Sequence, residues 1–246
     1  MSRKLISVLG ATVLSLAALP WTAQSAPVRT NRTVVGNLQA SELGGISPDV
    51  LSLALRAVQC GVASGDLHAP PTLTVIDYSR PSVEPRLWVY DLKTGKLLFK
   101  ELVAHGRNTG ENLATRFSDA MNSHQSSLGL FVTSDTYVGN NGYSLRLDGL
   151  EPGVNARARE RAIVMHGAPY VDVKLAETQG RLGRSWGCPA LREAVARDVI
   201  NTIRGGGVIF SYYPDAHWLK TSRFLNGCGG AATPRLGSGQ AVLSTS

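Results

Sequence analysis

The chain has 246 residues and a formal net charge of +7, from 25 Lys and Arg against 18 Asp and Glu. Its length suffices for one substantial domain, alone or with extensions, whose hydrophobic core needs no disulfide framework. Beyond residue 26 no stretch is apolar enough to cross a membrane, which excludes a protein with several membrane spans.

Residues 1–26 have the pattern of a secretory signal peptide. Arg3 and Lys4 precede an apolar run over residues 5–19, and we expect cleavage near Ser25 or Ala26. The alternative is a retained anchor, although the run is short for a bilayer span. Cleavage leaves 25 − 2 = 23 basic against 18 acidic residues, a net charge of +5. We therefore expect a soluble protein exported to the periplasm or cell envelope, where a basic charge suits an anionic cell wall but equally ordinary solubility.

Three cysteines, Cys60, Cys188 and Cys228, cannot all pair within one chain. An exported protein meets an oxidising compartment, so that a disulfide is expected to persist there. We expect Cys60 and Cys228 to pair, because this leaves unpaired the cysteine with the most unusual local sequence. The alternative is three free thiols, two of them simply buried.

A helix is predicted after a polar extension over residues 27–46, in the stretch SPDVLSLALRAVQC. Ser47 stands at the N-cap and Pro48 at the first helical position. The apolar residues that recur on one face are Leu51, Leu55 and Val58.

The middle of the chain is dominated by strand patterns. Two hairpins are predicted, one around Lys93-Thr94-Gly95 and one around Gly139-Asn140-Asn141-Gly142, where an Asn-Gly pair suits a type I′ turn. The predicted strands are residues 73–78, 86–92, 96–103, 129–138, 142–150 and a segment that ends at His166.

A long polar loop is predicted over residues 104–127, and loops of that length are often functional. After Cys188, apolar residues at every fourth position predict an amphipathic helix that ends at Gly205-Gly206-Gly207, followed by a strand. The pattern indicates a mainly β domain over residues 47–215. The extension over residues 216–246 ends rich in Gly, Ser and Ala, and we expect a mobile tail there.

Cys188 lies in the stretch GRSWGCPAL. The glycines of a hydrolase-type nucleophile elbow are absent, since Trp186 and Ala190 occupy their places. Because Pro189 favours the first position of a helix, we expect Cys188 at a helix N-cap, where the helix dipole favours the thiolate. Gly187 allows close backbone approach, so the amides at 187 and 188 are candidate oxyanion donors. A buried structural thiol is the alternative.

A thiol nucleophile needs a base within hydrogen-bond reach. His166 is the best candidate, because it ends a predicted strand and precedes Gly167, which is itself a candidate substrate-binding residue. His105 and His124, in the polar loop, are alternative bases. The competing interpretation of His166 is a satisfied histidine at a strand end.

Several stretches together resemble the YkuD-type L,D-transpeptidases, in the exported subgroup of murein L,D-transpeptidase catalytic domains. The stretches are MHGAPYV, GRLGRSWGCPAL, LTVIDYSRPSVEPRLWVYDLKTGKLLFKELVAHG and SHQSSLGLFVTSDTYVGNNGYSLRLDGLE. The resemblance covers about residues 47–213 and implies that residues 47–215 are the catalytic domain. It implies a mainly β fold, a mixed β-sandwich or barrel with an N-terminal helix and a helix following the catalytic cysteine.

The resemblance also implies roles for residues. Cys188 matches the family's nucleophile and His166 its base, while Ser185 and Gly187 match the small residues of the catalytic turn. The family's histidine before Gly-Cys is replaced by Trp186, which is a candidate wall of the substrate pocket or else a core residue.

A second departure is Ala190, where the family often has a polar residue. Its loss leaves Arg184 or Arg192 as candidates for stabilising the site or holding a carboxylate. The basic run over residues 156–162 is a further candidate for binding carboxylates, although a solvated face is the commoner reading.

The implied reaction is attack of the Cys188 thiolate on the carbonyl at the L-centre of diaminopimelate in a tetrapeptide stem. D-Alanine leaves and a thioester forms. An amine of a neighbouring stem then gives a 3-3 cross-link. Water in place of the amine gives an L,D-carboxypeptidase, or a hydrolase that detaches another group from diaminopimelate with the same dyad. The partners are donor and acceptor stems of peptidoglycan, with carbapenems as covalent inhibitors; no metal, other cofactor or nucleic acid is expected. An inactive wall-binding module is the alternative from another class.

Overall fold

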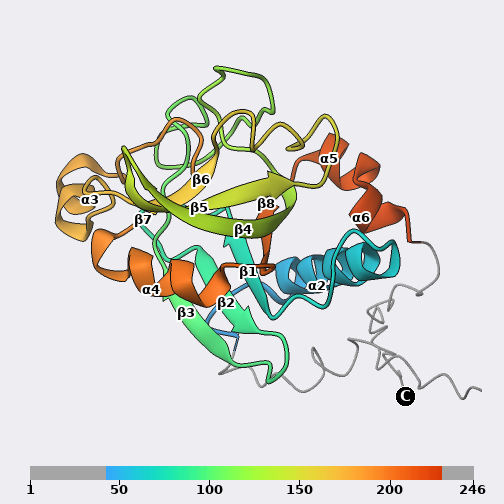
Figure 1. The fold of residues 1–246 in the computed structure, drawn as a ribbon. Helices are drawn as coiled ribbons and strands as arrows, with labels where there is room; N and C mark the ends of the chain where they lie inside the picture. Colours follow the sequence, from blue (N-terminus) through green and yellow to red (C-terminus); the bar gives the residue numbers. More distant parts are fainter. Residues whose placement is uncertain (1–42, 229–246) are drawn as a thin grey trace, which may run out of the picture. The chain divides into compact units, whose positions relative to one another are not determined.

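The protein is described here by a computed structural model over residues 43–228, so the predicted signal peptide lies outside the described residues. No helix within this part of the chain is long and apolar enough to cross a membrane. The elements, drawn in Figure 1, are α2 (Pro48–Ala63), β1 (Thr72–Asp77), β2 (Leu87–Asp91), β3 (Leu97–Glu101), β4 (Gly129–Gly139), β5 (Gly142–Gly149), β6 (Val164–Gly167), α3 (Val173–Gln179), β7 (Ala190–Leu191), α4 (Glu193–Ile203), β8 (Val208–Tyr212), α5 (Ala216–Thr221) and α6 (Arg223–Asn226).

The strands form one eight-stranded sheet in the order β3-β2-β1-β8-β4-β5-β6-β7. The pairs β1–β8 and β6–β7 are parallel, and the other neighbours are antiparallel. The two edges of the sheet meet beyond β3, where the Ala104 amide donates to the Ala190 carbonyl at 2.9 Å. The sheet is therefore a nearly closed barrel, and the predicted mainly β fold is confirmed.

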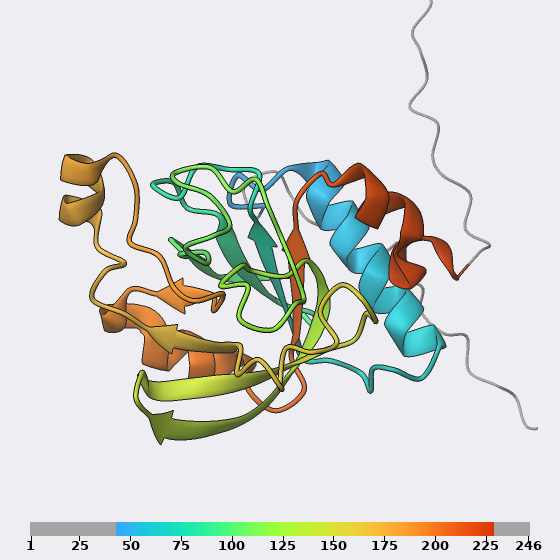
Figure 2. The same cartoon turned by 90° about the horizontal axis from the view of Figure 1, so that it is seen from above.

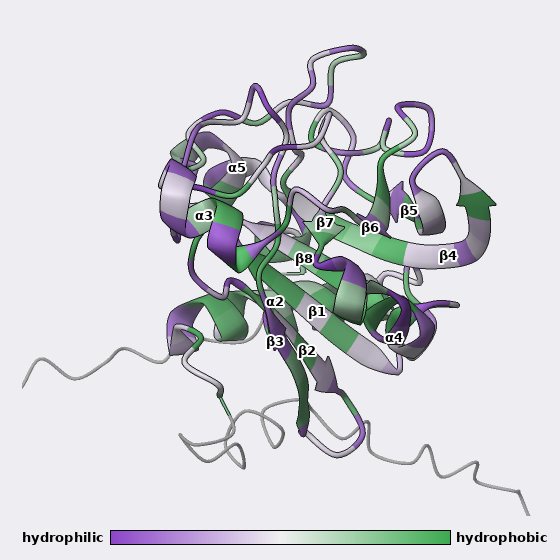
Figure 3. Ribbon diagram, turned by 90° about the vertical axis from the view of Figure 1, so that its left-hand side faces the viewer, coloured by the Kyte–Doolittle hydropathy of each residue, from purple (hydrophilic) through white to green (hydrophobic). Residues whose placement is uncertain are grey.

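Alternate residues of the central strands serve two cores on opposite faces of the sheet. In β2, Trp88 and Tyr90 belong to the cluster that includes α2, whereas Leu87 and Val89 belong to the cluster that includes α4. Figure 2 shows α2 and α4 on opposite sides of the strands, and Figure 3 shows hydrophobic stretches along β1 and β2. Alternation of this kind follows from the two-residue period of a strand.

The predicted helices on either side of the strand region are confirmed as α2 and α4. Helix α2 begins with Pro48 after Ser47, and the apolar face of the helix is buried. Helix α4 ends before Gly205, which has a φ of +73°. The buried residues of the predicted α2 face are Leu51, Leu55 and Val58.

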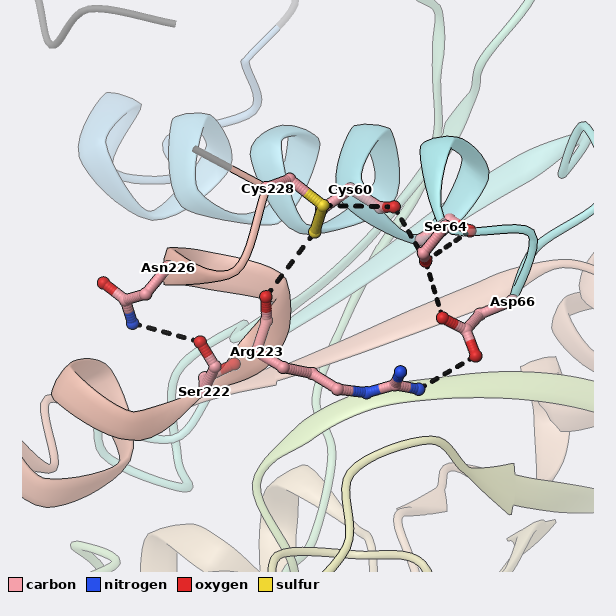
Figure 4. The surroundings of a disulfide bond; sticks show 8 residues. Cys60, Ser64, Asp66, Ser222, Arg223, Asn226 and Cys228 are labelled. Atoms are coloured by element: carbon pink, nitrogen blue, oxygen red, sulfur yellow. Dashed lines mark hydrogen bonds and ion pairs between the residues drawn. A yellow bond between two sulfur atoms is a disulfide. The ribbon is translucent and has the colours of Figure 1, made fainter. Parts of the chain in front are cut away.

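A disulfide joins Cys60 of α2 to Cys228 after α6, with their Cα atoms 5.5 Å apart (Figure 4). The predicted pairing is confirmed, and Cys188 is the free cysteine among the described residues. Beside the disulfide, Arg223 forms an ion pair with Asp66 at 2.9 Å.

The expected mobile tail from residue 216 is wrong for residues 216–228. This segment forms α5 and α6, and Trp218, Phe224 and Leu225 are buried in the core beside α2. Each of the two short helices contributes apolar side chains to this core, Trp218 from α5 and Phe224 and Leu225 from α6. Residues 229–246 lie outside the described part of the chain.

Two local predictions also need correction. The β4–β5 turn is not type I′, because Gly142 has a φ of +69° while neither Asn140 nor Asn141 is in the left-handed region that type I′ requires. Helix α3 was not predicted, although it carries ordinary signals. Asp172 caps it by accepting from the Leu175 amide at 2.8 Å, and Gly180 ends it with a φ of +69°.

Candidate active site

Residues 185–189, which we call the cysteine turn, are held by one serine. Ser185 Oγ donates to the Cys188 carbonyl at 2.7 Å and accepts from the Gly187 amide at 3.0 Å. Ser185 therefore fixes the conformation of the cysteine turn from within. The Gly187 amide, a predicted oxyanion donor, is engaged in this bond, whereas the Cys188 amide has no acceptor among residues 43–228.

Gly187 has a φ of +123°, which favours glycine. A Cβ at this position would lie 2.8 Å from the Gln125 carbonyl oxygen and 2.9 Å from Ile163 Cδ1. The close approach that the sequence predicts is therefore present. The atoms that come close to Gly187 belong to the chain itself, namely to Gln125 in the long loop and to Ile163 directly before β6.

Cys188 precedes β7, and α4 starts only at Glu193 with Arg192 at its N-cap. The predicted helix N-cap at Cys188 is therefore wrong, because two residues of strand follow Pro189 before the helix begins. The dipole of α4 falls off within its first turn and does not act on this thiol.

The Cys188 side chain is buried against the segment that leads into β6. The Val164 amide donates to Sγ at 3.5 Å, and Sγ lies 3.8 Å from the Ala162 carbonyl oxygen. Burial raises the pKa of the thiol, while the Val164 amide and the charge of Arg161 lower it. The sulfur is therefore a neutral thiol at neutral pH.

His166 lies on β6, where it pairs with Ser144 on one side and with Ala190 on the other. The pairing with Ala190 places it beside the strand that follows Cys188. Its Nδ1 lies 2.8 Å from the Gly167 carbonyl oxygen. A carbonyl oxygen only accepts, so Nδ1 carries the proton and Nε2 is left as an acceptor. Burial lowers the pKa of His166, which keeps the imidazole neutral.

The other two candidate bases have different surroundings. His105 accepts from Arg86 Nη2 at 2.8 Å through Nδ1, and its Nε2 faces the Gly110 carbonyl oxygen at 3.3 Å. Both nitrogens are engaged, so His105 stabilises the long loop and has no free acceptor. His124 stacks on Trp186 with ring centroids 5.0 Å apart.

A profile of the L,D-transpeptidase catalytic domain family matches residues 42–212. The chain belongs to this family. No protein with a curated description is similar enough to be matched.

Solved structures of L,D-transpeptidases resemble the chain only remotely. One from Mycobacterium smegmatis has 15% identity and a TM-score of 0.37, over 58% of this chain and 59% of that one. One from Stackebrandtia nassauensis has 14% identity and a TM-score of 0.36, over 70% and 73%. LdtMt1 in complex with imipenem has 15% identity and a TM-score of 0.36, over 58% and 59%. The chain thus spans less than two thirds of the first and third of these proteins.

Trp186 of this L,D-transpeptidase domain is 69% exposed, so it is not the core residue that was the alternative prediction. The space on the inner side of the cysteine turn is a cavity of about 10 Å³, bordered by Gly187 and Pro189 and by side chains of the sheet. This volume is no more than one water molecule needs. This cavity is therefore too small to hold a peptide, and Trp186 is an exposed side chain of the cysteine turn.

The two arginines predicted to stabilise the site or to hold a substrate carboxylate are bound by carboxylates of the domain itself. Arg184 Nη1 pairs with Glu111 at 2.5 Å, and Arg192 pairs with both oxygens of Glu101 at 2.8 and 2.9 Å. Each guanidinium is thereby committed to an internal ion pair. A substrate carboxylate would have to compete with Glu111 or Glu101 for either guanidinium.

The basic run over residues 156–162 separates into two kinds of arginine. Arg157 and Arg159 are half exposed and form surface ion pairs. These two arginines fit the predicted alternative of a solvated face. The Arg161 side chain is only 3% exposed and points inward. The sequence gives no signal that distinguishes Arg161 from its neighbours, because its burial depends on contacts with a segment about 40 residues away.

Proposed function

We propose that the chain is a peptidoglycan L,D-transpeptidase in which Cys188 is the nucleophile and His166 the base. The observation that carries the proposal is the parallel pairing of β6 with β7. It places His166 beside Ala190, two residues after Cys188, whose sulfur lies against Val164 on the same strand as His166. Membership of the family supplies the class of reaction.

Acylation starts from a neutral thiol and a neutral imidazole, since burial shifts the pKa values of Cys188 and His166 in opposite directions. His166 Nε2 takes the thiol proton as the sulfur attacks the carbonyl at the L-centre of diaminopimelate. The bond to D-alanine breaks, and the imidazolium returns the proton to the leaving amine. A thioester on Cys188 and free D-alanine result.

The tetrahedral intermediate needs a donor for its oxyanion. The Cys188 amide fills this role in the proposal, because it belongs to the nucleophile itself and has no acceptor among the described residues. The Trp186 amide also lacks an acceptor there, but it lies two residues before the nucleophile. The Gly187 amide would first have to leave Ser185 Oγ. Ser185 acts by holding the turn in place.

In the second half-reaction an amine of a neighbouring stem attacks the thioester and gives its proton to His166. The sulfur leaves, takes that proton, and a 3-3 cross-link is formed. Water in place of the amine makes the protein an L,D-carboxypeptidase. Trp186 supports the cross-linking outcome, because an exposed indole two residues before the nucleophile is suited to pack on a bound stem and displace water.

The test of the nucleophile is covalent labelling with imipenem, followed by intact mass. One acylation event is expected in the wild type and none in Cys188→Ala. Because Cys60 and Cys228 are joined in a disulfide, they offer no competing thiol. An adduct that persists in Cys188→Ala would contradict the assignment of Cys188 as the nucleophile. Absence of any adduct in the wild type would favour an inactive wall-binding module.

The outcome of the thioester is tested by incubating purified muropeptides with the enzyme. Dimers linked 3-3 are expected by mass spectrometry of the products. Tripeptides alone would show that water resolves the thioester, and the carboxypeptidase alternative would replace the transpeptidase.

We also propose export to the periplasm or cell envelope. The Cys60–Cys228 disulfide supports this location, since disulfides persist in oxidising compartments. Mass spectrometry of the protein from an envelope fraction should find a chain that begins after Ser25 or Ala26. A full-length chain confined to the cytoplasm would contradict the proposal.

A further inference from the structure

Cys188 faces a short segment that begins with a buried arginine. Sγ contacts the Ala162 carbonyl and the Val164 amide, and Arg161 directly precedes them. We infer that Arg161 is a positioning residue for Cys188: its guanidinium locks residues 118–127 against the cysteine turn and provides the fixed positive charge that stabilises the thiolate during the reaction. The inference rests on the proposed role of Cys188 as nucleophile.

The Arg161 guanidinium is held by four hydrogen bonds to one loop. Nη1 donates to the Ser118 carbonyl at 2.8 Å and to Ser127 Oγ at 2.7 Å. Nη2 donates to Ser123 Oγ at 3.1 Å and to the Gln125 carbonyl at 2.6 Å. All four acceptors lie in residues 118–127, so this single side chain fixes the end of the long polar loop.

The same guanidinium lies against the cysteine turn. A Cβ at Gly187 would be 3.4 Å from Arg161 Nη2 and 2.8 Å from the Gln125 carbonyl oxygen that Nη2 binds. Arg161, Gln125 and Gly187 are therefore packed together. Because Arg161 contacts both the loop and the turn, a change at its head group alters the position of the residue next to the nucleophile.

The charge of Arg161 is only partly neutralised. Asp119 Oδ1 lies 3.6 Å from Nη1 and has no hydrogen-bond partner among the described residues. Asp119 Oδ2 accepts from the Arg157 amide at 3.0 Å. The four hydrogen-bond acceptors of the guanidinium are neutral groups, so its positive charge still acts on Cys188, whose pKa it lowers against the effect of burial.

The other titratable groups near the sulfur carry no charge at neutral pH. Burial raises the pKa values of Tyr78 and Tyr170 to about 12, and Cys188 contributes to both shifts. Burial lowers the pKa of His166. Arg161, opposed by Asp119, is therefore the cation that acts on the thiolate within the described site.

The test measures the rate of Cys188 alkylation by iodoacetamide between pH 6 and 11, which gives the apparent pKa of the thiol. Arg161→Gln should raise that pKa and slow alkylation at pH 7.5 by about tenfold, since one pKa unit changes the thiolate fraction tenfold. Arg161→Lys keeps the charge and should fall between Arg161→Gln and the wild type. Arg159→Gln is the matched control, because Arg159 is half exposed and pairs with Asp148.

Asp119→Asn gives a second measurement that does not require removal of the arginine. It removes the opposing charge, so the thiol pKa should fall. Shifts in opposite directions for Arg161→Gln and Asp119→Asn support the inference, because loosening of the loop alone has no reason to reverse sign. Thiol pKa values equal to that of the wild type, or raised in both variants, overturn it. If Arg161→Gln fails to fold, Asp119→Asn decides by the sign of its shift.

Labelling of the wild type with imipenem separates this inference from the proposed function. Acylation at Cys188 with unshifted pKa values in the variants removes only the role of Arg161. Absence of acylation in the wild type removes the proposed function itself.

Discussion

Trp186 stacks on the imidazole of His124, with ring centroids 5.0 Å and ring planes 20° apart, and still exposes 69% of its surface. The indole is thus fixed on one face and open on the other, two residues before the nucleophile. A rigid aromatic surface of this kind buries large area on binding at low conformational cost.

Replacement of Trp186 by alanine should therefore affect substrate binding and not folding. We expect the KM for a muropeptide donor to rise severalfold, while the free energy of unfolding changes by no more than about 0.5 kcal/mol, as is usual for exposed sites. Val138→Ala is the control, since Val138 is 79% exposed at the tip of the β4–β5 hairpin. An unchanged KM would contradict a role for Trp186 in the substrate pocket.

Gly187→Ala should destabilise the protein and abolish labelling at Cys188. The left-handed φ costs about 1–3 kcal/mol for a residue with a side chain. The new Cβ would also press on the Gln125 carbonyl oxygen at 2.8 Å. Gly153→Ala isolates the conformational cost, because Gly153 has a φ of +76° with no atom within 4 Å of the added Cβ. Urea denaturation of both variants measures the difference, and equal losses would show that the contact with Gln125 is unimportant.

Removal of the Cys60–Cys228 disulfide should destabilise the domain by about 2–5 kcal/mol, since loops of more than 100 residues lie at the upper end of the chain-entropy range. The closed loop spans 168 residues. The measurement is the midpoint of guanidinium unfolding with and without a phosphine reductant. It is made in Cys188→Ala, so that the free thiol cannot contribute. An unchanged midpoint would mean that packing of α6 on α2 holds the C-terminal segment by itself.

His105 should make the folded state less stable in mild acid. Burial and the charge of Arg86 lower its pKa from 6.5 to about 4. Between pH 6.5 and pH 4, His105 is protonated in the unfolded chain but neutral in the folded chain. The free energy of unfolding therefore decreases as the pH falls from 6.5 to 4. The loss is at most about 3 kcal/mol.

His105→Asn keeps an acceptor for Arg86 and removes the titration. We expect the free energy of unfolding of this variant, measured in urea from pH 4 to 7, to depend less steeply on pH than that of the wild type. His68→Asn serves as control, because His68 is exposed. Equal slopes for the His105 variant and the wild type would refute the assignment.

Local sequence patterns determined much of this protein. Strand alternation, the Pro48 helix start and the two hairpins are short-range features, and the structure confirms them apart from the turn type at Asn140–Asn141. The odd number of cysteines, with the unusual surroundings of Cys188, was enough to predict the Cys60–Cys228 disulfide. The same stretch, together with His166, indicated the family.

The tertiary structure decided the electrostatics of the site. Cys188 is not at the N-terminus of a helix, because β7 lies between it and α4. Arg184 and Arg192 form ion pairs with Glu111 and Glu101 of the same chain. Arg161 is buried near Cys188, whereas the sequence groups it with the basic residues 156–162 of a solvated face. Each of these outcomes depends on which distant segment a residue pairs with or packs against. Burial and ion pairing are set by contacts between residues far apart in the chain, whereas helix and strand patterns are set by neighbours within a few residues.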